Sequence, residues 1–306
     1  MRIVHSLEEI PGFSSPIVLS IGNFDGLHIG HQAVLNHLLK KTKDQHAISA
    51  VLTFSNHPST VLRPSHPTSL LCSIPHKMHL LSQTGIDLTI LLPFTTSFSE
   101  QTAETFLRTI RQVLPFRFLI LGSDAHMGKN RDGDRETVTS LSHSFGFSVE
   151  YLSDCYYHGE RISSSLIRHH IQKGDFSHAA ALLGRPYTIY GPVLKGQGKG
   201  ASLGFPTANL AVENLCLPPL GVYAVEVSVG GKEHRGIANL GFAPTMRQEA
   251  SPLLEVHLFE HHEMLYEQTI DVRFLRFIRP ERRFHSLEEL KNQIALDVTE
   301  AKRSFP

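Results

Sequence analysis

In the first 183 residues, short apolar runs alternate with longer segments whose apolar residues recur at helical spacing. The apolar runs predict β-strands at 17–21, 47–54, 87–92, 117–121 and 148–152. The helical patterns predict α-helices at 30–42, 76–84, 100–113, 164–173 and 176–183. Strands separated by helices of about 10–15 residues favour βαβ units. This half is therefore expected to be an α/β domain built on a parallel sheet.

The pattern changes after Gly184-Arg185-Pro186, where short β-type runs separated by Gly and Pro turns replace the alternation. The runs lie at 187–194, 222–229, 233–238, 253–259 and 269–277, and they predict a small antiparallel β-barrel. An amphipathic helix follows over 286–303, and Ser286 with Glu289 forms a capping box at its start. The sequence therefore predicts two domains, residues 1–184 and residues 185–306.

The length of 306 residues is enough for two domains, and the composition narrows the possible functions only slightly. The formal net charge is 0, which gives no sign of a nucleic-acid or acidic-membrane partner. No apolar run approaches the roughly 20 residues of a membrane span, and Glu8 and Glu9 do not fit a signal peptide. Cys72, Cys155 and Cys216 are odd in number and far apart, so we expect free thiols and a cytoplasmic protein. The 20 histidines are scattered, and no Cys/His cluster with zinc-ligand spacing is expected.

A glycine-rich loop near residue 200 is one candidate site. Its phosphate-binding candidates are backbone amides and ammonium groups that can face an anion: Lys195, Gly196, Gly198, Lys199 and Gly200. Thr207 and Asn209 follow, and they offer hard oxygens of the kind that Mg²⁺ accepts beside phosphates. No Walker A pattern occurs in the chain. Glycine-lysine segments are more often plain surface loops, so that alternative stays open.

A second candidate site lies where the first predicted strand turns into a helix. His28 and His31 fall in this turn, at the carboxyl edge of a parallel sheet, where open α/β folds bind ligands. The helix N-terminus favours anions, both imidazoles can donate to phosphates, and Gly30 leaves room for a phosphate or base to approach. Two turn histidines are also often merely structural.

The stretch from Gly22 to His31, Gly-Asn-Phe-Asp-Gly-Leu-His-Ile-Gly-His, resembles the FAD synthetase module of the nucleotidyltransferase superfamily. Gly122-Ser123-Asp124 and the 161–168 segment continue the resemblance. It implies a Rossmann-like nucleotidyltransferase fold in which His28 and His31 hold the triphosphate. Nucleotide or phosphate contacts are implied for Gly22, Phe24, Asp25, Gly30, Ser164, Ser165 and Arg168, and flavin or ribose contacts for Asp124 and Arg161. The chain departs from the family at residues 124–128, Asp-Ala-His-Met-Gly, where the family usually has two aromatic residues.

Gly204-Phe205-Pro206-Thr207-Ala208-Asn209-Leu210 closely resembles the metal-nucleotide motif of the riboflavin kinase family, and the resemblance covers nearly all of 186–304. It implies Mg²⁺ near Thr207 and Asn209, and Glu255 as the general base. Arg279 and Phe284 are implied near the flavin, although an exposed charged turn would explain them equally well. Two departures do not affect these groups: Glu267 stands where Gly is usual, and Lys199 and Ala201 stand where Arg is common.

Together the resemblances imply a bifunctional enzyme that phosphorylates riboflavin with ATP to FMN and then adenylylates FMN to FAD. Two alternatives remain: a kinase whose adenylyltransferase module is degenerate, motivated by the altered 124–128 segment, and a non-catalytic flavin-nucleotide sensor or carrier. A dehydrogenase is disfavoured because the first strand–helix turn lacks Gly-x-Gly-x-x-Gly. The sequence leaves the oligomeric state open.

Overall fold

The structure, a computed structural model, describes residues 1–196, 199–242, 251–259 and 265–305. The chain forms two compact units. Met1–Thr68 and Lys77–Ser164 make the first unit, and Ser69–His76 and Ser165–Pro306 make the second. The segment 165–184 thus groups with the second unit, and the domain division after residue 184 stays a prediction.

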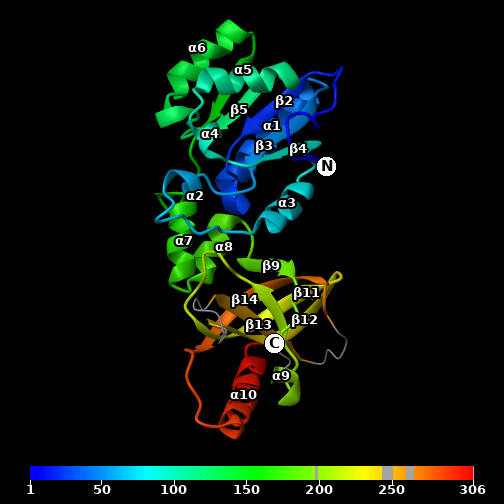
Figure 1. The fold of residues 1–306 in the computed structure, drawn as a ribbon, viewed down its shortest axis with the longest axis vertical. Coiled ribbons are helices and arrows are strands. Elements are labelled where there is room, and N and C mark those ends of the chain that lie inside the picture. The colour runs from blue at the N-terminus through cyan, green and yellow to red at the C-terminus, as the bar shows by residue number, and fades with distance from the viewer. Residues whose placement is uncertain (197–198, 243–250, 260–264, 306) are drawn as a thin grey trace. The chain divides into compact units, whose positions relative to one another are not determined.

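The first unit contains a six-stranded sheet, all parallel, in the order β1-β4-β3-β2-β5-β6 (Figure 1). The strands are β1 Arg2–Val4, β2 Ile17–Ile21, β3 Ile48–Phe54, β4 Leu88–Leu92, β5 Phe118–Gly122 and β6 Ser148–Leu152. The five predicted strands are confirmed. The edge strand β1 was missed because it is three residues long and is defined by its pairing with β4.

Helices cover both faces of this sheet, which explains its continuously apolar strands. Ile17 and Leu19 of β2 pack in one core with α5 (Ala103–Val113) and α6 (Arg135–Phe145). Val18 points the other way, into a core that α1 (Ile29–Asp44) and α3 (Ile74–Ser82) complete. The result is the Rossmann-like layering that the sequence predicts.

Helix α6 was not predicted, although the sequence contains its two end signals. The Asp134 side chain accepts a hydrogen bond from the Thr137 N–H at its start, and Gly146 ends it in the left-handed conformation. The shorter elements of the chain outside the barrel are η1 Asp25–Leu27, α2 Ser59–Leu62, α4 Thr96–Ser99, η2 Lys129–Arg131, β7 Tyr156–Tyr157, β8 Glu160–Arg161, α7 Ser164–Gln172 and α8 Phe176–Leu183.

The second unit is a nearly closed antiparallel barrel with strand order β10-β13-β12-β11-β14-β9. Its elements are β9 Thr188–Pro192, α9 Lys199–Ser202, β10 Ala208–Ala211, β11 Gly221–Val229, β12 Lys232–Phe242, β13 Pro252–Leu258, β14 Thr269–Arg279 and α10 Leu287–Lys302. A bridge between Leu194 and Asn209 joins the two sheet edges. The four-residue strand β10 was not predicted, because it is too short to show a periodic pattern.

Helix α10 covers one side of the barrel. Its Val298 and Ala301 pack with Val222, Ala224 and Ile237 of β11 and β12. At its start, Ser286 accepts a hydrogen bond from the Glu289 N–H at 3.1 Å, so Ser286 is confirmed as the N-cap. The Glu289 carboxylate accepts the N–H of His285 at 2.9 Å and not that of Ser286, so the reciprocal bond of the predicted capping box is displaced by one residue. None of the helices within the described residues combines the length and apolar character that crossing a membrane requires.

Candidate active sites

The turn between β2 and α1 is held in an unusual backbone conformation. Phe24, Gly26 and Leu27 all have positive φ angles, of 49°, 75° and 40°, and this region is costly for residues with a side chain. Phe24 and Leu27 are each 3% exposed, and their side chains belong to the core beneath α1. Burial of these two side chains compensates for the backbone strain. Phe24 therefore shapes the turn from inside the core, and its implied nucleotide or phosphate contact stays a prediction.

The turn lies at the point where the order of the parallel strands reverses. β2 and β5 are neighbours in the sheet. The strand that follows β2 in the chain, β3, lies on one side of this pair, and the strand that follows β5, β6, lies on the other side. Open α/β sheets bind their ligands at the carboxyl ends of the strands at such a switch point. Topology therefore marks the end of β2, followed by His28 and His31, and the end of β5, followed by Asp124, as one ligand-binding edge.

His28 is the N-cap of α1. Its Nδ1 accepts a hydrogen bond from the His31 backbone N–H at 3.3 Å, so a neutral His28 carries its proton on Nε2. The two imidazole rings stack with centroids 3.7 Å apart, and the Phe24 ring meets His31 edge-on at 5.3 Å. A Cβ at Gly30 would lie 3.1 Å from Cε1 of His28. Gly30 thus allows the His28 ring to approach the backbone, and the implied nucleotide or phosphate contact of Gly30 stays a prediction.

His31 is held as a neutral imidazole. Burial is the main reason that the pKa of His31 lies well below its usual range; repulsion from the Lys77 ammonium, and from His28 whenever that ring is protonated, lowers it further. Its Nδ1 is buried and makes no hydrogen bond to any of the described residues. His31 therefore supports His28 by stacking without adding a second positive charge to the turn.

This low pKa predicts a pH dependence of stability. The unfolded chain takes up a proton at His31 near the ordinary value of about 6.5, whereas the folded chain does not. The free energy of unfolding should therefore fall as the pH drops below about 6.5, by up to about 1.4 kcal/mol per pH unit for one proton. We expect urea unfolding of the first unit to lose less stability between about pH 7 and pH 5 in His31→Asn than in the unchanged chain.

The exposed His66 of the same unit offers the matched control. His66→Asn should keep the full pH dependence of the unchanged chain. Equal pH slopes for His31→Asn and the unchanged protein would mean that His31 titrates normally.

Lys77 is a buried cation that sequence reasoning missed. It is 3% exposed, and its Nζ donates to the Asn23 carbonyl at 3.0 Å, the Thr53 hydroxyl at 3.1 Å and the Phe54 carbonyl at 2.8 Å. The Thr53 hydroxyl in turn donates to the Asn23 carbonyl at 3.0 Å. Lys77 thus ties the β2–α1 turn to the end of β3. The available signal was its place three residues after Ile74, on the apolar face of α3.

The end of β5 brings together two of the predicted flavin or ribose contacts. Arg161 donates to Asp124 at 3.0 Å and to Asp154 at 3.5 Å, and Ser123 donates to Asp154. Gly22 packs under the turn, since a Cβ there would lie 3.1 Å from the Phe24 ring.

The predicted phosphate motif at 164–168 divides between the units. The Ser164 hydroxyl donates to the carbonyl of the buried Asp25 at 3.4 Å, within the first unit. Ser165 and Arg168 belong to the second unit, where Arg168 Nε donates to the Ser69 carbonyl at 2.7 Å. The structure therefore joins Ser164 to the turn, and the phosphate contacts of the other two residues stay predictions.

The second unit contains a partly open cavity of about 730 Å³, lined by barrel strands, by the loop before β10 and by α10. On β13, Leu254, Val256 and Leu258 are buried, while the alternating Glu255 and His257 line the cavity. This alternation follows from the two-residue period of a strand. Glu255, which sequence statistics alone would place in solvent, therefore faces a partly open cavity and is itself half-buried.

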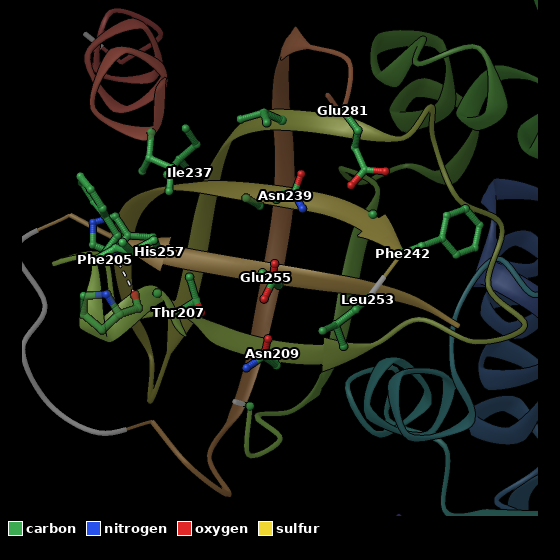
Figure 2. Close-up of a pocket in the computed structure, with 18 of the residues that line it drawn as sticks. Phe205, Thr207, Asn209, Ile237, Asn239, Phe242, Leu253, Glu255, His257 and Glu281 are labelled. Carbon is green, nitrogen blue, oxygen red and sulfur yellow. Dashed lines mark hydrogen bonds between the residues drawn. The ribbon is translucent and has the colours of Figure 1, made fainter. Parts of the chain in front are cut away.

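Strand register aligns three polar side chains across the cavity. Glu255 pairs with Asn209 on β10 and with Asn239 on β12, and Figure 2 shows the three side by side on successive strands. Asn209 is 5% exposed. Asn239 was missed as a site residue, because its place beside Glu255 depends on the pairing of strands that the sequence leaves unassigned.

The loop before β10 is packed closely against the residues that follow it. A Cβ at Gly196 would lie 2.1 Å from Asn209 Nδ2, and one at Gly200 would lie 2.4 Å from the Phe205 carbonyl and 3.2 Å from the Thr207 hydroxyl. These two glycines therefore allow the loop to approach Thr207 and Asn209. Lys195 is exposed and lines the cavity. Gly198 lies outside the described residues, and Lys199 is the first residue of α9.

His257 connects this loop to β13. Its Nδ1 lies 2.8 Å from the Pro206 carbonyl oxygen, and the Phe205 ring meets its imidazole edge-on at 5.5 Å (Figure 2). Thr207 is thus anchored to the strand that carries Glu255. The sequence signal was the i, i+2 spacing of Glu255 and His257 on a predicted strand.

Arg279 lines the cavity and also has a structural role, while its flavin contact stays a prediction. Its Nε donates to both Asp297 carboxylate oxygens at 2.9 and 3.0 Å, its Nη2 donates to Asp297 at 2.7 Å, and its Nη1 donates to the Pro280 carbonyl at 2.9 Å. Asp297 is 4% exposed, so this bidentate pair fastens α10 to the end of β14. Phe284 lines the cavity, with the Arg282 guanidinium 4.7 Å from its ring centroid.

Comparison with known proteins covers both units. Residues 11–166 match the family model described as FAD synthetase, and residues 183–305 match the one described as riboflavin kinase. A Haemophilus influenzae protein named bifunctional riboflavin kinase/FMN adenylyltransferase is 36% identical over 307 residues, covering 100% of this chain and 99% of its own. A Bacillus subtilis protein of the same name is 34% identical over 311 residues, covering 100% and 98%.

Among solved structures, one titled "Crystal Structure of Macrolide-efflux Protein from Streptococcus pneumoniae" aligns with a TM-score of 0.81. It is 27% identical and covers 100% of this chain and 99% of its own. The match shows that both units occur together in that protein, whose title names a role different from those of the two relatives above.

Proposed function

The chain belongs to the family of bifunctional riboflavin kinase/FMN adenylyltransferases, and we propose here which residues perform the two reactions. The enzyme phosphorylates riboflavin with ATP to give FMN and ADP, and it transfers the adenylyl group of a second ATP to FMN, which gives FAD and pyrophosphate. The three cysteines are free thiols, and we place the enzyme in the reducing cytoplasm.

The kinase reaction is assigned to the barrel cavity. The observation that carries this assignment is the Glu255 carboxylate facing the cavity in register between Asn209 and Asn239. Glu255 takes the proton of the ribityl hydroxyl while the oxygen of that hydroxyl forms the new bond to the γ-phosphorus of ATP. ADP leaves with the electrons of the broken P–O bond, so the protein supplies mainly positioning and a base.

Mg²⁺ fits the donor set beside this base. The Thr207 hydroxyl and the Asn209 amide oxygen are hard, uncharged ligands that leave room for phosphate oxygens and water. When bound, the ion would neutralise charge on the ATP phosphates. His257 holds the Pro206–Thr207 backbone in place, and the backbone N–H groups around Gly196 and Gly200 with Lys195 bind the phosphates.

The adenylyltransferase reaction is assigned to the β2–α1 turn. A neutral His28 carries its proton on Nε2, because its Nδ1 accepts the His31 N–H as the cap, and we assign this Nε2–H and the N-terminus of α1 to the triphosphate. Both groups bind the triphosphate as charge moves to the departing pyrophosphate. The FMN phosphate attacks the α-phosphorus of ATP directly, and Asp124 with Arg161 contacts the flavin or ribose. No covalent enzyme intermediate is needed.

The altered 124–128 segment does not favour the kinase-only alternative. Ala125 and Met127 stand where the family usually has aromatic residues, and both pack against the core of the first unit. Their side chains therefore fill core space, so the substitution alters core packing. A sensor or carrier is disfavoured because it needs no base at the position of Glu255.

One assay tests the proposed function against its alternatives. Purified protein is incubated with riboflavin, ATP and Mg²⁺, and the flavins are separated by chromatography. We expect both FMN and FAD. FMN alone would support the kinase-only alternative, and neither product would support the sensor or carrier.

Lys77→Met should separate the two activities. It leaves the acceptor oxygens of Asn23, Thr53 and Phe54 without this donor, which costs about 1–3 kcal/mol of stability in the first unit. Because the β2–α1 turn loses the bonds through Lys77 and keeps the hydrogen bond from Thr53 to Asn23, its position is less firmly fixed, and we expect FMN adenylylation to fall by about 10–100-fold. Initial rates of FAD formation from supplied FMN measure the effect.

Riboflavin phosphorylation, measured on the same sample, should be unchanged and reports that the second unit is folded. The exposed Lys40 of α1 gives the matched control, and Lys40→Met should leave both rates unchanged. Unaltered adenylylation in Lys77→Met would show that the turn holds its shape without Lys77.

A further inference from the structure

The turn between α7 and α8 brings three metal-ligating side chains together. His170 comes from the last turn of α7, Asp175 caps α8, and His178 lies in the first turn of α8. The ligand atoms of all three lie within 4.8 Å of one another. The prediction from the sequence concerned only Cys/His clusters with zinc-ligand spacing. This group of two histidines and one aspartate falls outside that pattern, because the spacing His-x4-Asp-x2-His crosses two helices.

The backbone of this turn is firmly fixed. Gly174 adopts a left-handed conformation with φ of 73°, and its N–H donates to the Ile171 carbonyl at 2.8 Å. The Asp175 N–H donates to the His170 carbonyl at 2.9 Å. The positions of His170 and Asp175 relative to each other are thus set by main-chain hydrogen bonds and glycine geometry.

The Asp175 carboxylate divides its two oxygens between two tasks. Oδ1 accepts the His178 backbone N–H at 3.2 Å as the cap of α8. Oδ2 faces both imidazoles, 3.0 Å from His170 Nδ1 and 2.8 Å from His178 Nδ1. The two rings lie parallel, with centroids 5.1 Å apart and planes 14° apart. The cap therefore orients the carboxylate so that both Nδ1 atoms point at one oxygen.

The Asp175 carboxylate is held in place by hydrogen bonds. Burial raises the pKa of Asp175, but hydrogen bonds from the His178 backbone and from the two rings outweigh this and hold the pKa below its usual range. Each ring bond uses an Nδ1–H, whereas a metal ion takes the lone pair of an unprotonated imidazole nitrogen. Binding of an ion at Nδ1 therefore replaces both ring hydrogen bonds and moves the ring protons to Nε2 or to solvent.

We propose that His170, Asp175 and His178 form a binding site for one divalent ion of the zinc type. Two imidazoles and a carboxylate are ligands of Zn²⁺, Co²⁺ and Ni²⁺ and do not suit Mg²⁺. Ligands at about 2.0–2.2 Å from one tetrahedral ion lie about 3.3 Å apart, so the observed pairs need to open by only a few tenths of an ångström. The side chains of the three residues are 17%, 35% and 57% exposed, so water can reach the ion and fill the fourth position.

None of the three residues lines the barrel cavity, so this site is separate from the kinase site. A bound ion would link the end of α7 to the start of α8 and would stabilise the folded chain by mass action. It differs from the Mg²⁺ proposed with ATP in its ligands and in its location.

Cobalt binding tests the proposal on the full chain after EDTA treatment and removal of the chelator. Co²⁺ is titrated into the protein without flavin or ATP, and the visible absorption bands of nitrogen-ligated Co²⁺ are followed. We expect one equivalent to bind, and Zn²⁺ to displace it. His178→Ala and Asp175→Asn should each weaken binding by about 100-fold or more, since even the outer partners of a ligand cost 10–100-fold. Asp175→Asn keeps a capping residue at α8, so loss of binding there does not reflect loss of the helix.

His169→Ala is the matched control, because His169 is exposed and adjacent on α7 and its ring lies 5.8 Å from that of His170, but it is not one of the three ligands. It should bind Co²⁺ as the unchanged chain does. The proposal would be overturned if the unchanged chain showed no saturable Co²⁺ binding. It would also be overturned if His178→Ala bound Co²⁺ as tightly as the unchanged chain, or if His169→Ala lost as much affinity as His178→Ala. A thermal shift with ZnCl₂ that vanishes in His178→Ala would support it independently of any enzyme activity.

Discussion

Glu255→Gln should lower riboflavin phosphorylation by about 10²–10⁴-fold, the usual contribution of a general base. Conversion of supplied FMN to FAD should remain unchanged. Gln has nearly the same shape as Glu, so the strand register with Asn209 and Asn239 is preserved while the proton acceptor is lost. The effect should appear in kcat, with little change in the KM for riboflavin or ATP, because the base acts in the transition state.

The cavity supplies a matched control for this variant. Glu213 also lines it, but lies after β10 and is not on β13. Glu213→Gln removes the same charge from the same cavity and should leave phosphorylation within a small factor of the unchanged enzyme. If Glu213→Gln lost as much activity as Glu255→Gln, the loss would come from removing a negative charge from the cavity and not from removing the base. If Glu255→Gln kept its activity, another group would be the base.

His28→Asn and His28→Ala together should separate capping from chemistry at the first site. Both variants remove the imidazole Nε2–H beside the α1 N-terminus, and we expect each to lower FMN adenylylation by about 10²–10³-fold, as loss of one preorganised donor does. Asn can still accept the His31 N–H as an N-cap, whereas Ala cannot. Ala alone should therefore lower the free energy of unfolding, by about 0.5–2 kcal/mol. Initial rates of FAD formation and urea unfolding of each variant provide the two measurements.

Riboflavin phosphorylation, measured in both His28 variants, should stay unchanged and serves as the internal control for the second unit. An active Asn variant beside an inactive Ala variant would mean that His28 matters only as the cap. Inactivity of both, with stability lost only in Ala, is the result that the proposed role requires.

Much of the fold could be predicted because its signals are local. The apolar strands of the first unit are buried on both faces, so each appears as an unbroken run, and the barrel strands alternate with a period of two. The ends of α10 and the glycine-rich loop likewise depend on neighbouring residues. Glu255 was identified through its resemblance to a family motif. Strand alternation alone would have assigned Glu255 to the face that points into solvent, as it does for most carboxylates on strands.

Other features depend on contacts between distant segments and leave little trace in the sequence. Strands β1 and β10 are three and four residues long and exist because β4 and β13 pair with them. Asn239 joins the second site through strand register, and Lys77 reaches the first from α3 through three hydrogen bonds. In the same way, the close approach of the His28 ring to Gly30 depends on how the turn folds back over α1.

Local pattern was thus sufficient for the two-part architecture, for most of its helices and strands, and for the two segments where ATP was expected. Tertiary packing decided which side chains lie beside those segments. It also buried Phe24 in the core, paired Arg279 with Asp297, and brought His170, Asp175 and His178 together. The physical reason is that periodicity reports burial against a core. The direction and partners of a polar side chain depend on strand pairing and helix packing that no short stretch of sequence specifies.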